Sequence, residues 1–308
     1  MSTEPSSNKR IGYYDYRLDN FHAEVYLSAL RGPLADRGFE IAGATALEPE
    51  PSATWAAERD LPYYDTIEQL AGEVDYLMVL APSNPELHLE MCQQAFPLGK
   101  QTFVDKTFAP DVATARAIFE LADAHDLPIQ STSALRSTPI QEFVKRQDEK
   151  PYSVHICSSG STLEEYGIHP LELAVSCLGH EVQSLMRHKA DWGLQLSLTY
   201  HDGRIAVIDF LSGTDCPFSA TLTDREGSHH FEVDGGHLFV DAAASILDFF
   251  EAGESLIDSR ETLVIRRLLD LATSANDSHK LIPVSTNSRP LAAPHWKTTP
   301  QTASQREN

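Results

Sequence analysis

Phe103-Val104-Asp105-Lys106-Thr107 is a short apolar run that ends on an acid and a lysine, just before the helix-patterned segment 111–125. Open α/β sheets bind their ligands at the carboxyl ends of the strands. A strand of this kind would carry its terminal charges to that edge. Lys106 is therefore the first candidate for chemistry.

The residues before this stretch alternate between strand and helix patterns. The run 76–81 is apolar at every position, as expected of a central parallel strand covered by helices on both faces. Strand, helix and strand in alternation predict a doubly wound parallel sheet with right-handed crossovers. We expect a Rossmann-like domain over residues 10–135.

The pattern changes after residue 135, where strands come in neighbouring pairs. The strand pattern 194–200 returns as 205–210 through His201-Asp202-Gly203, a favoured hairpin turn. Helices are expected at 238–251 and 260–274, and both should close this second domain. The sequence thus predicts an α+β domain with an open, mainly antiparallel sheet over residues 136–284. The polar segments 1–9 and 285–308 are predicted to be disordered.

Composition narrows the partners to small molecules. A net charge of −21 over 308 residues argues against nucleic acid and against an anionic membrane. The four cysteines have no metal-binding spacing, and no signal peptide or anchor is evident, so a cytoplasmic protein with reduced thiols is expected. His229, His230 and His237 lie in a strand hairpin where neighbours point to opposite faces, so no metal site is expected.

Several motifs in order resemble the glucose-fructose oxidoreductase, inositol dehydrogenase and rhizopine-catabolism (Gfo/Idh/MocA) family. They are Ala81-Pro82-Ser83-Asn84 with His88, Gly99-Lys100, Asp105-Lys106, Arg136-x-x-Pro139, and Gly167-Ile168-His169-Pro170-Leu171-Glu172. The resemblance covers roughly residues 10 to 284. It implies a nicotinamide-dependent oxidation of sugars, inositols or related alcohols.

The resemblance implies catalytic roles for Lys106, His169 and Glu172. Lys106 would bind a substrate hydroxyl and lower its pKa, and His169 would accept the proton. Glu172 would orient His169 or a substrate hydroxyl. The family's usual Glu-Lys-Pro reads Asp105-Lys106-Thr107 here. The inositol dehydrogenase branch has an aspartate and a second histidine where this chain has Glu172 and Ser176. A solvated strand-end lysine and a structural histidine are the alternatives.

The cofactor turn departs further from the family. A Rossmann site requires glycines after the first strand so that the pyrophosphate can approach the helix. This chain has Tyr14 to Asn20 where G-x-G-x-x-G belongs. Asp15 would repel a phosphate, whereas Arg17 would attract one. Glu48 lies two residues past the usual ribose-binding acid and favours NAD over NADP.

The expected cofactor contacts come from the ends of four strands. They are Tyr14, Asp15, Tyr16, Arg17, Glu48, Ala81, Pro82, Ser83, Asn84, His88 and Asp105. Arg136 and Tyr166 are expected to bind substrate, Arg136 as a fork for a carboxylate or phosphate unless it forms a structural ion pair.

Three functions fit this pattern. The first is an NAD(P)-dependent oxidoreductase acting on a sugar, polyol or sugar-acid hydroxyl. The second is a non-catalytic ligand-binding or regulatory paralogue that has lost the dinucleotide, and the third is a redox-neutral enzyme with tightly held NAD. A homodimer or homotetramer is expected to form through the outer face of the second sheet. The residues expected on that face are Leu196, Leu198, Val207 and Phe210.

Overall fold

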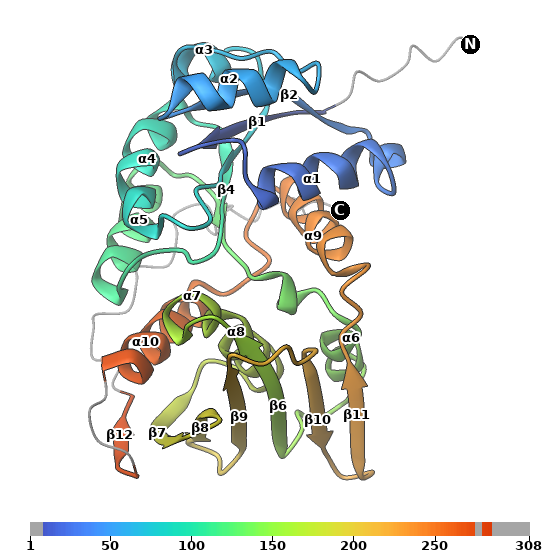
Figure 1. The fold of residues 1–308 in the computed structure, drawn as a ribbon, viewed down its shortest axis with the longest axis vertical. Coiled ribbons are helices and arrows are strands. Elements are labelled where there is room, and N and C mark those ends of the chain that lie inside the picture. The colour runs from blue at the N-terminus through green and yellow to red at the C-terminus, as the bar shows by residue number, and fades with distance from the viewer. Residues whose placement is uncertain (1–8, 275–278, 285–308) are drawn as a thin grey trace, which may run out of the picture.

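The computed structural model describes residues 9–274 and 279–284, which form two sheets with helices between and around them (Figure 1). The segments 1–9 and 285–308, for which disorder is expected, lie outside the described residues except for Lys9, which begins the first strand. Both the Rossmann-like fold and the second, mainly antiparallel sheet are confirmed.

The first domain is a parallel sheet with the order β2-β1-β3-β4-β5. A parallel bridge between Ala44 and Tyr63 extends it beyond β2. β1 therefore lies beside the point where the strand order reverses, which is where such sheets bind ligands. The elements are β1 (Lys9–Asp15), α1 (Phe21–Arg31), η1 (Ala35–Arg37), β2 (Phe39–Ala46), α2 (Pro49–Ala57), α3 (Ile67–Ala71), β3 (Tyr76–Val79), η2 (Pro85–Leu87), α4 (His88–Ala95), η3 (Phe96–Leu98), β4 (Gln101–Val104), α5 (Val112–Ala124) and β5 (Ile129–Gln130).

Local sequence explains where these helices begin. The side chain of Asn20 caps α1 by accepting the N–H groups of His22 and Ala23, and Asp111 caps α5 through Thr114. β3 and β4 are buried at three of their four positions each, as predicted for central strands. These strands end side by side, which brings the residues after Val79 and Val104 together.

The second domain contains a seven-stranded sheet with the order β11-β10-β6-β9-β8-β7-β12. All neighbours are antiparallel except β6 and β9, which run parallel and end at the same edge. The sequence patterns do not predict strands β6 and β7. The elements are η4 (Ala134–Arg136), α6 (Pro139–Lys145), β6 (Ser153–Gly160), α7 (Leu163–Tyr166), α8 (Ile168–Leu178), β7 (Val182–Ala190), β8 (Gly193–Tyr200), β9 (Ile205–Ser212), β10 (Ser219–Thr223), β11 (Ser228–Glu232), α9 (Leu238–Ala252), α10 (Ser259–Ser274) and β12 (Leu281–Pro283).

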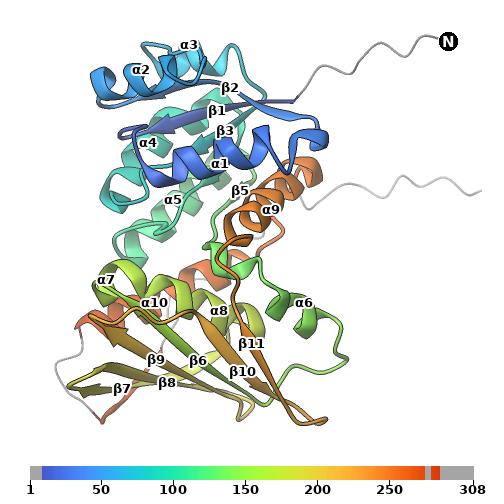
Figure 2. The same ribbon diagram turned by 45° about the vertical axis from the view of Figure 1, so that its right-hand side comes forward.

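Helix α9 does not close the second domain, as the sequence suggests, but packs on the first. It lies beside α1 in both ribbon views (Figures 1 and 2). Ile246 and Phe250 belong to the same buried cluster as Tyr13 of β1 and Tyr26 of α1. The apolar face of a helix does not specify which sheet the helix covers. Here the helix follows a strand of the second domain but packs on the first domain.

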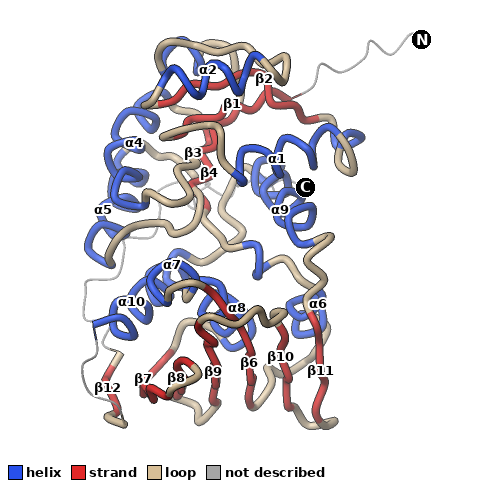
Figure 3. The backbone as a smooth tube through the Cα atoms, viewed as in Figure 1, coloured by secondary structure: helices blue, strands red, loops and turns tan. Residues whose placement is uncertain are grey.

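Helices α8 and α10 cover only one face of the second sheet, as Figure 3 shows. Leu196, Leu198 and Phe210 lie on this covered face, within the core, so their assignment to the outer face is wrong. Only Val207 lies on the other face, where its neighbours Ser197 and Asp209 are polar. The alternation of side chains along a strand predicts which residues share a face of the sheet. It does not predict which of the two faces the helices cover. Among the described residues no helix is long and apolar enough to cross a membrane.

Candidate functional site

The turn after β1 is closed around the carboxylate of Asp15. Its Oδ1 accepts the backbone N–H groups of Tyr16 at 2.7 Å, Ala81 at 2.9 Å and Arg17 at 3.3 Å. Its Oδ2 accepts the side-chain amide of Asn20 at 2.8 Å. Asp15 is fully buried, and burial raises its pKa to about 6.

The other expected residues of this turn lie at its surface. Arg17 forms a forked pair with Asp19, with Nη2 at 2.7 Å from Oδ2, and its Nε lies 3.7 Å from Glu48. The hydroxyl of Tyr16 donates to Glu48, which precedes α2 at the carboxyl end of β2. Glu48 thus lies at the position expected for a ribose contact, but with a cation beside it.

Two expected cofactor residues have structural contacts instead. The hydroxyl of Tyr14 donates to Gln94 on α4, away from the turn. Both ring nitrogens of His88 lie against backbone carbonyls, 3.0 Å from Phe108 and 2.7 Å from Leu80. His88 is fully buried and fixes the segments after β3 and β4. Neither residue is available to a dinucleotide.

The end of β4 carries a buried pair and a lysine. Asp105 is fully buried, and its Oδ2 lies 2.6 Å from Nδ1 of His22 at the start of α1. Burial alone would raise the pKa of Asp105, but His22 and Lys106 hold it below its ordinary value. The ammonium of Lys106 donates to the carbonyl of Pro82 at 3.2 Å, and the peptide bond that follows Lys106 is cis. Ser83, also expected here, is exposed, and Asn84 donates to Glu86.

His169, near the start of α8, faces the first domain through Ser133. Its Nδ1 lies 2.7 Å from Oγ of Ser133, which also accepts the N–H of Leu135. Burial, Lys106 and His22 together lower the pKa of His169 to about 3. The imidazole of His169 is therefore neutral at physiological pH.

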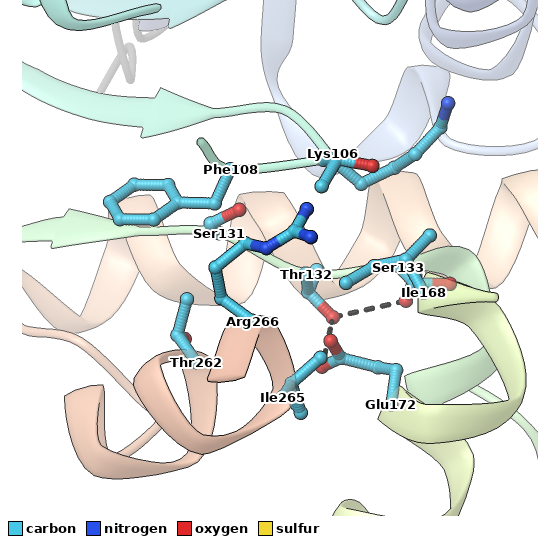
Figure 4. Close-up of a pocket in the computed structure, with 11 residues that line it drawn as sticks. Lys106, Phe108, Ser131, Thr132, Ser133, Ile168, Glu172, Thr262, Ile265 and Arg266 are labelled. Atoms are coloured by element: carbon cyan, nitrogen blue, oxygen red, sulfur yellow. Dashed lines mark hydrogen bonds between the residues drawn. The ribbon is translucent and has the colours of Figure 1, made fainter. Parts of the chain in front are cut away.

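Glu172 and Arg136 form a buried ion cluster that is closed to substrate. Arg136 contacts Glu172 through Nε and lies 2.6 Å from Glu261 through Nη1. Glu172 also accepts from Thr132, as Figure 4 shows, and the Lys106 ammonium in that view points away from it. Hence the fork at Arg136 is taken by the protein, and Ser133 rather than Glu172 contacts His169.

Two hollows lie next to these residues. A small cavity with Lys106, Ser133 and Glu172 in its wall encloses about 10 Å³, barely room for one water molecule. An open groove of about 560 Å³ lies along the loops that follow β6 and β9. The rings of Tyr166 and Phe218 line this groove and lie 6.0 and 6.1 Å from the ring of His169. We call this hollow the groove; its wall also includes Ser159, Ser161, Thr214, Asp215 and Cys216.

The described part of the chain gives the groove several hydrogen-bonding groups and no lysine or arginine. Tyr166, expected to contact substrate, lies in its wall. Cys216 in the same wall has its Sγ 3.4 Å from that of Cys157 on β6, and both are free thiols. Sequence reasoning missed His22, Ser133 and the groove residues other than Tyr166. Only the place of His22, just after the capping Asn20 at the cofactor turn, was a usable signal.

A dinucleotide fits part of this site. Glu48 and Tyr16 would hold a ribose at the end of β2, and Lys106 lies where the reactive end would reach. The turn between them is different, because Asp15 and Asn20 already accept the N–H groups that a pyrophosphate needs. The residues at the turn do not fit a pyrophosphate in this conformation.

Comparisons with known proteins agree with the fold. Residues 20–133 match the model of the Gfo/Idh/MocA family, described as an oxidoreductase family with an NAD-binding Rossmann fold. No curated protein sequence matches the chain. Many solved structures resemble it at low identity, and this likeness concerns the fold alone.

Three of these structures illustrate the likeness. A putative myo-inositol dehydrogenase from Sinorhizobium meliloti 1021 has a TM-score of 0.73 and 15% identity, over 90% of this chain and 100% of that one. An oxidoreductase from Agrobacterium radiobacter, in complex with NAD+, L-tartaric acid and magnesium, has a TM-score of 0.73 and 13% identity over 90% and 98%. A mutant of a 3-ketoreductase from Actinomadura kijaniata, in complex with TDP-benzene and NADP, has a TM-score of 0.67 and 15% identity over 86% and 97%.

Fold, site and family model together define an α/β oxidoreductase of the NAD-binding Rossmann class. The match of residues 20–133 to the Gfo/Idh/MocA family model confirms the resemblance found in the sequence.

Proposed function

We propose that the protein oxidises a hydroxyl group of a small uncharged sugar or polyol, or reduces the matching carbonyl, with a nicotinamide cofactor. The observation that carries this proposal is the groove beside His169. It joins hydroxyl-bearing side chains to the rings of Tyr166 and Phe218. Such a wall suits a ligand with many hydroxyl groups and some apolar surface.

The charge of the groove supports an uncharged substrate over a sugar acid or a sugar phosphate. Among the residues that the structure describes, its wall has Asp215 but no arginine or lysine, and the fork of Arg136 is held by two glutamates. A carboxylate or phosphate would enter without a bidentate partner. We therefore favour neutral sugars and polyols within the broader class.

Lys106 would stabilise negative charge on the reacting oxygen. One of its three N–H groups is used by the carbonyl of Pro82, and the other two can bind a substrate hydroxyl. A fixed ammonium lowers the pKa of a bound hydroxyl. A nicotinamide ring, when bound, supplies the site that accepts the hydride.

His169 would accept the hydroxyl proton through Nε2. With Ser133 at Nδ1, the ring is fixed with its other nitrogen free for substrate. Because the pKa of His169 is lowered to about 3, the ring is neutral and able to accept, but it is a weak base. We therefore assign the larger share of the rate to Lys106.

We propose that NAD(H) is preferred to NADP(H). Glu48 at the end of β2 would repel a 2′-phosphate, and Arg17 beside it is already paired with Asp19. The test is turnover of neutral sugars and polyols, sugar acids and sugar phosphates with each cofactor. Turnover of neutral compounds with NAD is expected. Turnover of phosphorylated compounds alone, or with NADP alone, would contradict the respective assignment.

A second function, ligand binding without a dinucleotide, is favoured by one observation. The cofactor turn is filled by the chain's own carboxylate at Asp15. In that case the groove would bind its ligand and Lys106 and His169 would serve as contacts. Sugar binding with no turnover by either cofactor would support this function over the first.

A further inference from the structure

The turn between β1 and α1 lies where Rossmann sheets bind the pyrophosphate of their cofactor. That subsite is formed by backbone N–H groups of the turn and of the helix that follows. Positions 15, 17 and 20 have the spacing of the three glycines in G-x-G-x-x-G, and here they are Asp, Arg and Asn. Each position therefore places a side chain where the family has none.

These side chains already occupy the donors of the turn. Three N–H groups, from Tyr16, Arg17 and Ala81, point to one oxygen of Asp15. The N–H groups of the first turn of α1, from His22 and Ala23, point to Asn20. An anionic oxygen thus lies in the anion subsite, and it is covalently part of the chain.

The charge at this point also opposes a second anion. Asp15 and Asp105 are both fully buried, and Asp105 is one of the groups that raise the pKa of Asp15. Arg17 is paired with Asp19, His22 contacts Asp105, and Lys106 donates to the carbonyl of Pro82. A pyrophosphate beside Asp15 would bring further negative charge close to two buried carboxylates.

We propose that Asp15 is an internal substitute for the cofactor pyrophosphate, so that NAD(H) binds only when this carboxylate leaves the turn. The proposal rests on the nicotinamide dependence proposed above. The energy needed to displace Asp15 subtracts from the affinity for the cofactor, because only the displaced state binds. Dinucleotide affinity is thereby set by one side chain at the first position of the fingerprint.

The test is a titration of NADH into the full-length wild type, Asp15→Gly and Asp15→Asn, by calorimetry or nicotinamide fluorescence. Asp15→Gly frees the three N–H groups and removes the charge, so it should bind NADH at least about tenfold more tightly than wild type. Asp15→Asn removes the charge but fills the space, and should fall between them. Glu50→Gln, in the first turn of α2, is the control for loss of a nearby carboxylate outside the turn.

Two further readouts keep the outcomes distinct. Thermal unfolding shows whether each variant is folded, and Asp15→Ser replaces the glycine variant if that variant is not. Equal NADH affinity in wild type and Asp15→Gly overturns the inference, whether both bind or neither does. Tighter NADH binding by Asp15→Gly upholds it, even if no sugar or polyol is oxidised, a result that would count against the proposed function alone.

Discussion

Nδ1 of His22 lies 2.6 Å from Oδ2 of Asp105, which joins the start of α1 to the end of β4 directly beside Lys106. Both side chains are buried, and the pair comes from segments 83 positions apart. The pair holds the residue before Lys106 in place, and with it the position of the ammonium. His22 thus acts as a positioning residue for the site.

Replacing His22 by alanine should destabilise the protein by about 3 to 5 kcal/mol, because it leaves the buried carboxylate of Asp105 without its partner. The free energy of unfolding in urea measures this. In the double variant His22→Ala with Asp105→Asn, the loss should be smaller than the sum of the two single losses. Additive losses would show that the pair is not coupled.

Replacing Arg136 by methionine should also cost about 3 to 5 kcal/mol in the free energy of unfolding, because Glu172 and Glu261 would lose their shared cation. Arg146→Met is the matched control. That arginine forms an exposed pair with Glu142, and its loss should change stability by less than about 1 kcal/mol. A folded, stable Arg136→Met variant that has lost only substrate binding would instead support the fork predicted from sequence.

Asp15 should make the protein less stable as the pH rises. Its pKa is raised to about 6 in the folded state, so the folded protein holds this proton more tightly than the unfolded chain does. The stability that this bound proton contributes is present below about pH 4 and is lost as the pH rises through 6. Asp15→Asn lacks this titrating group. Its free energy of unfolding should therefore rise relative to that of wild type by roughly 3 kcal/mol between about pH 4 and pH 7. A constant difference across that range would contradict the burial of an ionised carboxylate.

His169 should make the protein less stable as the pH falls, opposite to the effect of Asp15. Its pKa is lowered to about 3, so stability is present above the ordinary histidine pKa and is lost as the pH falls below it. Relative to His169→Gln, the free energy of unfolding of wild type should fall by roughly 2 kcal/mol by about pH 5. His201→Gln, at an exposed hairpin turn, is the control. If the two glutamine variants depend on pH alike, His169 is not shielded as described.

Much of the fold was predictable because alternation and helical spacing are local properties of the sequence. The strands around Val79 and Val104 and the position of Lys106 at a strand end follow from such patterns. The choice of partner across long separations was not predictable. The pairing of Arg136 with Glu172, the covered side of Leu196 and the packing of α9 on the first domain all depend on which surfaces meet.

The site shows the same division. The sequence predicts that the turn at Asp15 departs from the family. From sequence alone, however, the carboxylate is expected only to repel a phosphate. Its role as an acceptor depends on the N–H of Ala81, which is 66 positions away and reaches it only in the folded sheet. Likewise, Ser133 contacts His169 across the two domains, and no local pattern indicates that contact.

The most direct test of the central claim is the turnover of Lys106→Met on the best neutral sugar or polyol with NAD, compared with wild type and with Lys145→Met. Lys145 is an exposed residue of α6, and its replacement should leave turnover unchanged. We expect kcat to fall at least about 100-fold in Lys106→Met, a larger loss than in His169→Asn, while the protein remains folded. Turnover of Lys106→Met at the wild-type rate would contradict it.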